Sequence, residues 1–238
     1  MSEPTPTIRL VSFDVWGTLL RGNPVFKARR EALVAEAFGT GATPTADAMA
    51  TADEHLDADT LRTGNHYGCA ERLERTADVL GVPPLPDAAL AAFEAGLTDA
   101  LGTDPPTLIE PDLPDTFGRL RTAGLGLAVT SNTGFLTGVQ MRPVLVGLGL
   151  RVDHYVFSDE VGRSKPAPEI FNHLAGAVGY RPAEILHVGD NEVADVRGAL
   201  GAGLQAGWYR PDAADQPGVV ASIRELVSGF DPLGPAEA

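Results

Sequence analysis

Polar side chains suited to acid–base or metal chemistry follow four short apolar runs of this sequence. They are Asp14, Ser131 with Asn132, Ser158 with Asp159, and Asp190 with Asn191. Carboxylates gathered in one place repel each other unless a cation neutralises them, and Mg²⁺ prefers hard oxygen ligands together with a substrate phosphate. The residue types therefore predict a magnesium site that works on a phosphoryl group, with Asp14 and Asp190 as its ligand pair.

Lys165 is one of only two lysines in the chain, and it stands in a short loop after one of these runs. A lysine beside an attacking carboxylate would hold it in place and offset the charge that develops on a transferred phosphoryl group. Asp195, which follows Asp190 closely, would contact the metal or orient its ligands. Ser131 and Asn132 would donate hydrogen bonds to the phosphoryl oxygens.

Each of these residues also has a simpler structural explanation. Asp14 before Gly17 and Thr18 is typical of a turn, and Ser131-Asn132 or Asp190-Asn191 could cap a following helix. Their joint occurrence at the ends of apolar runs favours one shared site.

The segments that must position these residues alternate between helical and strand-like patterns from Leu113 onward. Helices are predicted over 113–123, 135–148, 167–178, 192–202 and 217–228, and strands over 125–131, 153–158, 184–189 and 204–209. Strands separated by helices predict a parallel sheet with helices on both faces, which strand 8–13 completes. Ligands of such α/β sheets bind beyond the carboxyl ends of the strands. Three carboxylates, Asp14, Asp159 and Asp190, are expected to converge there with the Ser131 hydroxyl.

A different pattern separates the first strand from the rest of the sheet. Four Ala-rich helices are predicted over 24–38, 45–61, 69–80 and 86–101, with Gly39, Gly64, Gly81 and Gly102 just past their ends. We therefore expect a core formed by residues 1–21 and 105–238 and a helical insertion formed by residues 22–104. Residues 229–238, rich in Pro, Gly and Ala, are predicted to be a loose tail.

Length and composition fit an enzyme-sized globular protein. The chain has 238 residues, of which 44% are hydrophobic and 21% charged, a balance that argues against a disordered or membrane protein. Its net charge of −14 gives no electrostatic basis for binding nucleic acid. The single cysteine, Cys69, permits no internal disulfide, and the first residues lack a signal-peptide pattern. We expect a cytoplasmic monomer or homodimer that acts on a small molecule, with no nucleic-acid or membrane partner.

Four motifs in this order make the chain resemble the haloacid dehalogenase (HAD) superfamily of hydrolases. The matching segments are Asp14-Val15-Trp16-Gly17-Thr18-Leu19, Val129-Thr130-Ser131-Asn132, Ser158 through Lys165-Pro166, and Val188-Gly189-Asp190 through Asp195. The resemblance implies a Rossmann-like α/β core and a helical cap inserted between the first two motifs, where the four predicted helices fall.

The resemblance also implies roles for individual residues. Asp14 would be the nucleophile of a covalent aspartyl intermediate that water then hydrolyses. Ser131 would bind the phosphoryl or carboxylate group of the substrate, and Lys165 would steady Asp14. Asp14, Asp190, and the backbone carbonyl of Trp16 would hold Mg²⁺, with Asp195 close by.

Trp16 departs from the pattern of the family's phosphatases. Most of them carry a second aspartate at this position as general acid and base, a function worth about 10²- to 10⁴-fold in rate that an indole cannot supply. Haloacid dehalogenases have an aromatic residue there, because halide leaves without a proton. Trp16 therefore favours a dehalogenase, whereas Asp190 favours metal chemistry.

Other dehalogenase and phosphonatase markers are missing. The stretch Gly41–Asp47 lacks the cap arginine of dehalogenases, and Lys27 lies too close to Asp14 along the chain to be the cap lysine of phosphonatases. We therefore predict a Mg²⁺-dependent, phosphatase-like hydrolase of a small phosphorylated metabolite. A dehalogenase-like hydrolase is the alternative, and a HAD-like binding protein without turnover is a third hypothesis.

Substrate specificity would come from the cap. The polar loop from Arg62 to Gly68 could face the site, and His66 within it could replace the missing acid, although a solvated turn explains the same residues. Trp16 and Phe135 could form an apolar wall beside the nucleophile, and His187 is expected to serve packing within its strand.

Overall fold

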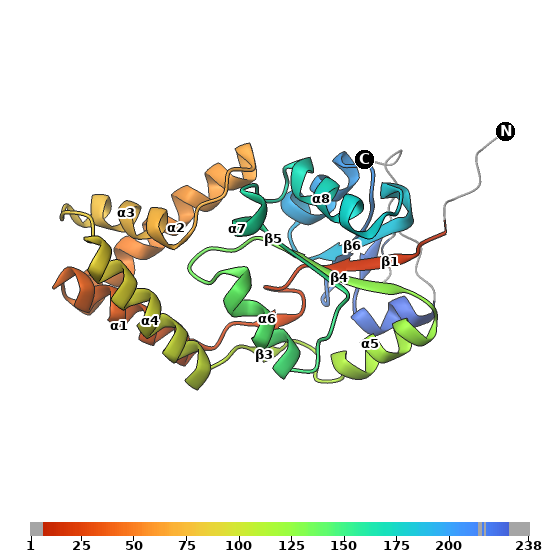
Figure 1. The fold of residues 1–238 in the computed structure, drawn as a ribbon, viewed down its shortest axis with the longest axis horizontal. Helices are drawn as coiled ribbons and strands as arrows, with labels where there is room; N and C mark the ends of the chain where they lie inside the picture. Colours follow the sequence, from red (N-terminus) through yellow and green to blue (C-terminus); the bar gives the residue numbers. More distant parts are fainter. Residues whose placement is uncertain (1–6, 214–215, 217, 229–238) are drawn as a thin grey trace.

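A parallel six-stranded sheet forms the centre of the computed structural model, which describes residues 7–213, 216 and 218–228 (Figure 1). The strand order is β5-β4-β1-β6-β7-β8, and every pairing is parallel. The strands are β1 (Leu10–Phe13), β4 (Gly126–Ser131), β5 (His154–Phe157), β6 (Ile185–Gly189), β7 (Gln205–Tyr209) and β8 (Val219–Val220). The predicted parallel α/β fold is thus confirmed, and the predicted tail lies outside the described residues.

Helices cover both faces of the sheet because buried side chains alternate along its strands. Val11 and Phe13 belong to the larger buried cluster with α5 (Leu113–Thr122), α6 (Gly138–Gly147) and the 3₁₀ turn Ile223–Ser228. Leu10 belongs to the cluster on the opposite face, with α8 (Pro168–Val178) and α9 (Gly198–Gly201). The remaining short elements are α7 (Ser158–Val161) and the 3₁₀ turn Pro182–Glu184.

The four inserted helices follow the first strand in the sequence and lie together at one end of the molecule (Figure 1). They are α1 (Pro24–Phe38), α2 (Ala42–Thr63), α3 (Cys69–Leu80) and α4 (Asp87–Thr103). A short antiparallel pair, β2 (Leu20–Arg21) with β3 (Thr107–Leu108), joins the two chain segments that lead into and out of them. The boundaries at 21/22 and 104/105 stay a prediction.

Glycine ends three of these helices as expected. Gly39, Gly64 and Gly81 have φ values of 65°, 70° and 69°, a left-handed conformation that side chains disfavour. The expectation for Gly102 was wrong, because α4 continues through Thr103 and Asp104 caps it. Among the residues that the structure describes, no helix is both long and apolar enough to cross a membrane.

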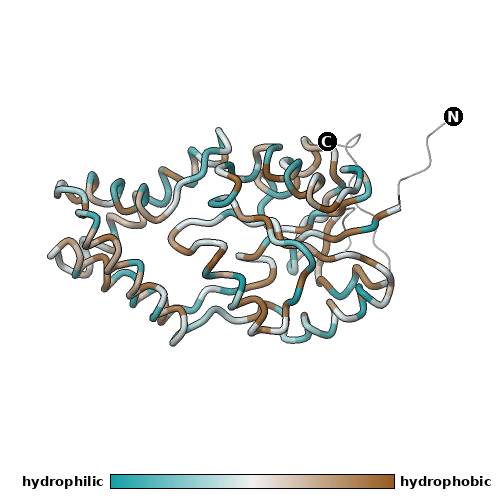
Figure 2. Tube along the Cα trace, in the orientation of Figure 1, coloured by the Kyte–Doolittle hydropathy of each residue, from teal (hydrophilic) through white to brown (hydrophobic). Residues whose placement is uncertain are grey.

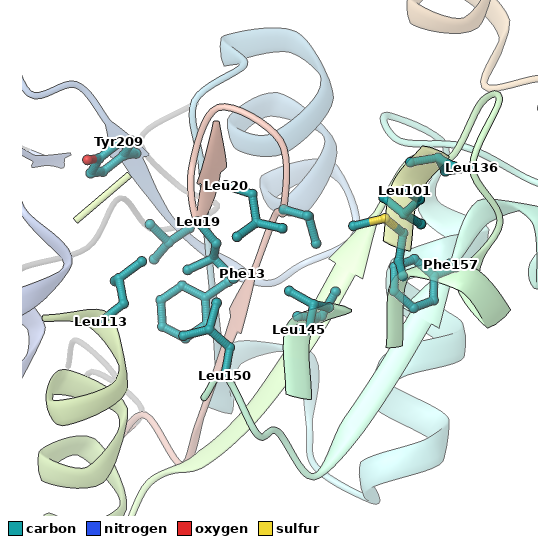
Figure 3. Close-up of a cluster of buried hydrophobic side chains, with 14 of the residues drawn as sticks. Phe13, Leu19, Leu20, Leu101, Leu113, Leu136, Leu145, Leu150, Phe157 and Tyr209 are labelled. Carbon is teal, nitrogen blue, oxygen red and sulfur yellow. The ribbon is translucent and has the colours of Figure 1, made fainter. Parts of the chain in front are cut away.

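A continuous apolar cluster connects the sheet to the inserted helices. Phe13 packs with Leu113 and Leu145 under the sheet, and Leu101 of α4 lies with Phe157 at the other end of the same cluster (Figure 3). Hydrophobic and hydrophilic residues alternate along the inserted helices and the helices of the core, as in amphipathic helices (Figure 2). Burial of apolar surface stabilises a fold by about 25 cal/mol per Å² removed from water. This cluster therefore helps to hold the inserted helices against the core.

The structure corrects three predicted helices. The segment 217–228 contains β8 and a 3₁₀ turn, because its β-branched Val219 and Val220 extend the open edge of β7. The helix predicted over 135–148 begins only at Gly138, after a loop in which Thr137 caps the helix. The helix predicted over 192–202 opens with a π-helical turn, Glu192–Arg197, before α9.

Candidate active site

Asp14 lies at the carboxyl end of β1, where its main-chain N–H donates to the Val188 carbonyl at 2.9 Å. Its carboxylate is buried, with 7% of the residue exposed. Ser131 Oγ donates to Asp14 Oδ1 at 2.9 Å, and Lys165 Nζ donates to the same oxygen at 2.6 Å. No hydrogen bond from the described residues reaches Oδ2. Asp14 is therefore oriented through one oxygen and has the other free to react.

Lys165 lies between two carboxylates, those of Asp14 and Asp195. Its ammonium group lies 2.6 Å from Asp14 Oδ1 and 2.6 Å from Asp195 Oδ1. Burial lowers the pKa of Lys165, but the charges and hydrogen bonds of Asp14 and Asp195 outweigh it and raise the pKa above its ordinary value. Lys165 is accordingly a permanent cation. Burial also raises the pKa of Asp14, more than the charge of Lys165 lowers it.

Asn132 fixes the loop that carries Lys165. Its side-chain amide donates to the Lys165 carbonyl at 3.0 Å, and its side-chain oxygen accepts from the Lys165 N–H at 2.7 Å. Asn132 lines the cavity as predicted, but its side chain is committed to this pair of bonds. Positioning of Lys165 is therefore the role that the geometry supports for the Asn132 side chain.

Asp195 belongs to a buried polar chain that the sequence did not reveal. Its Oδ1 lies 3.1 Å from His187 Nε2, and its Oδ2 accepts from the Asn191 N–H at 2.9 Å. His187 Nδ1 lies 3.2 Å from Ser12 Oγ, its cross-strand neighbour. Burial lowers the pKa of His187, so the neutral ring donates to Asp195 from Nε2. Only the pairing of β1 with β6 brings Ser12 and His187 together.

Three carboxylates meet where a divalent cation would be held. Asp14, Asp190 and Asp195 each offer an oxygen, and these atoms lie within 4.8 Å of one another. Asp190 is the exposed member, yet partial burial and the charges of Asp14 and Asp195 raise its pKa to about 6. The Lys165 ammonium group contacts two of these acids, Asp14 and Asp195. The donor set therefore fits a hard cation.

Asp14 and Asp190 are better placed than Asp195 to bind a cation. Both Asp195 oxygens already accept hydrogen bonds, so its geometry favours holding Lys165. The Asp190 carboxylate accepts a long hydrogen bond from another side chain, Thr18 Oγ1, at 3.4 Å. Gly17, at φ 82°, lets the chain pass so close to Asp190 that a Cβ there would overlap its carboxylate.

A cavity of about 840 Å³ lies between the strand ends and the inserted helices. Asp14, Trp16, Asn132, Lys165 and Asp190 line it from the core side. Trp16 and Phe135 both belong to the lining, as predicted for an apolar wall. Trp16 is half-buried, so its indole occupies part of the space beside the nucleophile.

Two predicted residues point elsewhere. Asp159 does not converge with the other acids, because its carboxylate accepts from Thr133 Oγ1 at 2.9 Å and from the Gly138 N–H at the start of α6. Asp195 takes the third place instead. His66 is half-buried and lies outside the cavity lining, with its Nδ1 3.0 Å from Ser158 Oγ. That contact attaches the predicted loop to the core.

The inserted helices contribute charged residues to the cavity that sequence reasoning missed. They are Arg30, Asp53, Asp57 and Arg72, and Lys27, which the sequence suggested only as a phosphonatase lysine, lines the cavity as well. The stretch Gly41–Asp47 has no arginine, but α1 and α3 place Arg30 and Arg72 in the cavity lining. A charged residue on an Ala-rich helix resembles a solvated surface position, so no local signal separated these residues from the exposed ones.

Comparisons with known proteins identify the family of this chain. The model of the haloacid dehalogenase-like hydrolases matches residues 8–203. A ribulose-1,5-bisphosphate 5-phosphatase of Halopiger xanaduensis is 31% identical over 129 residues, 52% of this chain and 53% of that protein. A phosphoserine phosphatase of Thermus thermophilus is 40% identical over 103 residues, 41% of this chain and 39% of that protein. The matches thus span about half, or less, of these curated relatives.

A solved structure agrees with the fold. The HAD hydrolase YfnB of Bacillus subtilis, solved bound to magnesium, superposes with a TM-score of 0.67 at 20% identity. The alignment covers 93% of this chain and 98% of that one.

Proposed function

The chain belongs to the haloacid dehalogenase-like hydrolases, and we propose that within this family it is a Mg²⁺-dependent phosphatase of a small phosphorylated metabolite, with Asp14 as its nucleophile. One observation carries the proposal: Asp14 Oδ1 is held by Lys165 at 2.6 Å and Ser131 at 2.9 Å, while Asp190 completes an acidic cluster beside it. The phosphatases among its relatives support the same reaction class.

These contacts support the following reaction. Asp14 Oδ2 attacks phosphorus, the bond from phosphorus to the leaving oxygen breaks, and an aspartyl phosphate forms. Water then attacks the same phosphorus atom, which releases inorganic phosphate and restores the carboxylate. Lys165 and Ser131 keep Asp14 oriented through both steps. A Mg²⁺ ion held by Asp14, Asp190 and the Trp16 carbonyl would offset the charge of the phosphoryl oxygens.

Trp16 limits the range of leaving groups. An indole does not donate a proton to an alkoxide, and Asp53 and Asp57, the carboxylates that line the cavity from the inserted helices, are bonded to Arg72. Substrates whose leaving group departs without a proton should therefore react best. Examples are acyl phosphates, which release a carboxylate, and phosphate esters of acidic phenols, which release a phenolate.

Trp16 is also compatible with a dehalogenase. Halide departs without a proton, so an aromatic residue beside Asp14 suits 2-haloacids, which Asp14 would attack at carbon. The acidic cluster argues against this reaction, because it would repel a carboxylate substrate and its product halide unless a cation were present.

The deciding experiment follows both products at once. The purified protein is incubated with and without Mg²⁺ against acetyl phosphate, aryl and alkyl phosphates, and L-2-chloropropionate, with phosphate and halide release recorded. Phosphate release that needs Mg²⁺ supports the proposal. Halide release without metal would replace it with dehalogenation. Neither product, combined with tight binding of a phosphate ester, would support the binding-protein hypothesis.

Metal binding should stabilise the fold more at neutral than at acidic pH. The pKa of Asp190 is raised to about 6 from an ordinary 3.8, so the folded protein holds an extra proton between about pH 4 and 6. Without metal, the stability that this proton provides is lost as pH rises through 6, because the cluster then carries its full charge. We expect the Mg²⁺-induced rise in Tm to be larger at pH 7.5 than at pH 5.

Thermal scans of two variants check this expectation. Asp190→Asn should abolish the Mg²⁺-induced rise and should raise the metal-free Tm at pH 7.5. Asp47→Asn, an exposed acid on α2 outside the cavity lining, is the matched control and should behave like the wild type. An equal Mg²⁺ effect in the Asp190→Asn variant would rule out Asp190 as a ligand.

A further inference from the structure

Arg30 of α1 is a cation in the cavity without an acidic partner. It lines the cavity together with Asp14, and no carboxylate oxygen of the described residues lies within 4.0 Å of its guanidinium. Its Nε is buried and has no hydrogen-bond partner among them. A buried N–H that stays unpaired costs free energy, so such groups are usually satisfied by a ligand or by water.

Each of the other cations that line the cavity has a carboxylate within 4.0 Å. Lys165 faces Asp14 and Asp195 at 2.6 Å. Arg72 bonds Asp53 and Asp57, each at 2.6 Å. The remaining cation, Lys27, is mostly exposed and lies 3.9 Å from Glu31 on its own helix.

The nearby acids compensate the positive charge of Arg30 only in part. Burial lowers the pKa of the guanidinium more than the charges of Asp53 and Glu31 raise it. Asp53, the first of these acids, is bonded to Arg72 and is not free to pair with Arg30. An anion that enters the cavity would find its uncompensated positive charge at this point.

Phe135 holds the guanidinium in place. The Arg30 Cζ lies 4.7 Å from the centroid of the Phe135 ring, a cation–π contact that covers one face of the guanidinium. Phe135 is itself buried and packs edge-on against Phe93 of α4, with centroids 6.3 Å apart. The stack restrains Arg30 before any ligand arrives, and its planar donors remain suited to an oxyanion.

We propose that Arg30 binds a second anionic group of the substrate, a carboxylate or another phosphoryl group, while Asp14 attacks the first phosphoryl group. The inference rests on the proposed phosphatase function and narrows its substrate class to phosphate esters that carry an additional oxyanion. Arg30 is then the specificity-determining residue contributed by the inserted helices.

Matched substrate pairs test the proposal. One pair is 2-phosphoglycolate and ethyl phosphate, which differ in a carboxylate. The other is 1,3-propanediol bisphosphate and propyl phosphate, which differ in a second phosphoryl group. Arg30→Met keeps an unbranched apolar stem against Phe135 and removes the donors, Arg30→Lys keeps the charge, and Arg29→Gln changes a half-exposed arginine that pairs with Asp104.

The expected effect is selective. Arg30→Met should lower kcat/KM about 10- to 100-fold for one or both substrates that carry a second anionic group, and less than about 3-fold for ethyl phosphate and propyl phosphate, which lack it. Arg30→Lys should recover part of the loss, and Arg29→Gln should change neither member of a pair. The pair that responds identifies the second group as carboxylate or phosphate.

Three results separate the possible failures. If Arg30→Met changes both members of each pair equally, the inference is wrong while the phosphatase proposal stands. If the wild type hydrolyses acetyl phosphate but no member of either pair, the inference is wrong, because esters with a second oxyanion are then not substrates. If it hydrolyses neither these esters nor acetyl phosphate, the phosphatase proposal fails first. Melting temperatures of all three variants show whether a loss of rate reflects unfolding.

Discussion

Replacing Asp14 with asparagine should abolish turnover while the protein stays folded. We expect kcat to fall by about 10⁴-fold or more, because removal of a nucleophile removes the covalent path altogether. Asparagine retains the shape of the side chain and its Oδ1 can still accept from Ser131 and Lys165. Lys165 also keeps its bond to Asp195, so its charge does not become unpaired.

The stability of this variant is part of the prediction. Burial raises the pKa of Asp14, which means that the folded protein resists the charged form of this carboxyl. A neutral amide should therefore cost little, and the metal-free Tm should stay at or above that of the wild type. Single-turnover assays with a chromogenic phosphate ester, together with Asp14→Ala to exclude slow deamidation of asparagine, measure the loss. A wild-type rate in either variant would remove Asp14 from the nucleophile role.

Replacing Trp16 with aspartate should have the second largest effect, and in the opposite direction. A carboxyl group at this position could protonate the leaving oxygen and later activate water. General acid–base catalysis of this kind typically contributes about 10²- to 10⁴-fold. We expect kcat/KM for alkyl phosphates to rise within that range. Acyl phosphates and acidic phenyl phosphates, whose leaving groups need no proton, should gain little.

The matched control for this variant is Trp16→Asn. Asparagine has the size of aspartate but transfers no proton, so the ratio of the two variants isolates proton transfer from the loss of the indole. The measurement is the dependence of log kcat/KM on leaving-group pKa across a series of phosphate esters. This slope should be steep for the wild type and Trp16→Asn and shallow for Trp16→Asp. Equal slopes in all three proteins would show that another group protonates the leaving oxygen.

Much of the fold was accessible from local patterns. Alternating apolar segments identified β1, β4, β5, β6 and β7, and their separation by helices predicted a parallel sheet. β8 was not predicted, because a segment of two valines is too short to show a periodic pattern. These valines form a strand because they pair with the open edge of β7. The π-helical turn at Glu192–Arg197 likewise has no pattern that separates it from an α-helix.

The candidate site divides in the same way. Asp14, Ser131 and Asp190 could be named because each lies at the carboxyl end of a strand, and parallel strands bring these ends to one edge. The same rule failed for Asp159, which also follows a strand end. Its side chain meets the N–H group of Gly138 at the start of α6, and that capping contact turns it away from the cavity.

The sequence by itself determined the α/β core, the place of the helical insertion and the acids, serine and lysine that the strand ends present. These features depend on periodicity and on residues close to one another along the chain, which local physics controls. The tertiary structure decided the pairing of His187 with Asp195, the bonds from Asn132 to Lys165 and the unpaired guanidinium of Arg30. Each of these depends on which side chains packing brings together and which it leaves without a partner. Such contacts arise only when distant segments share a buried volume, so no spacing in the sequence encodes them.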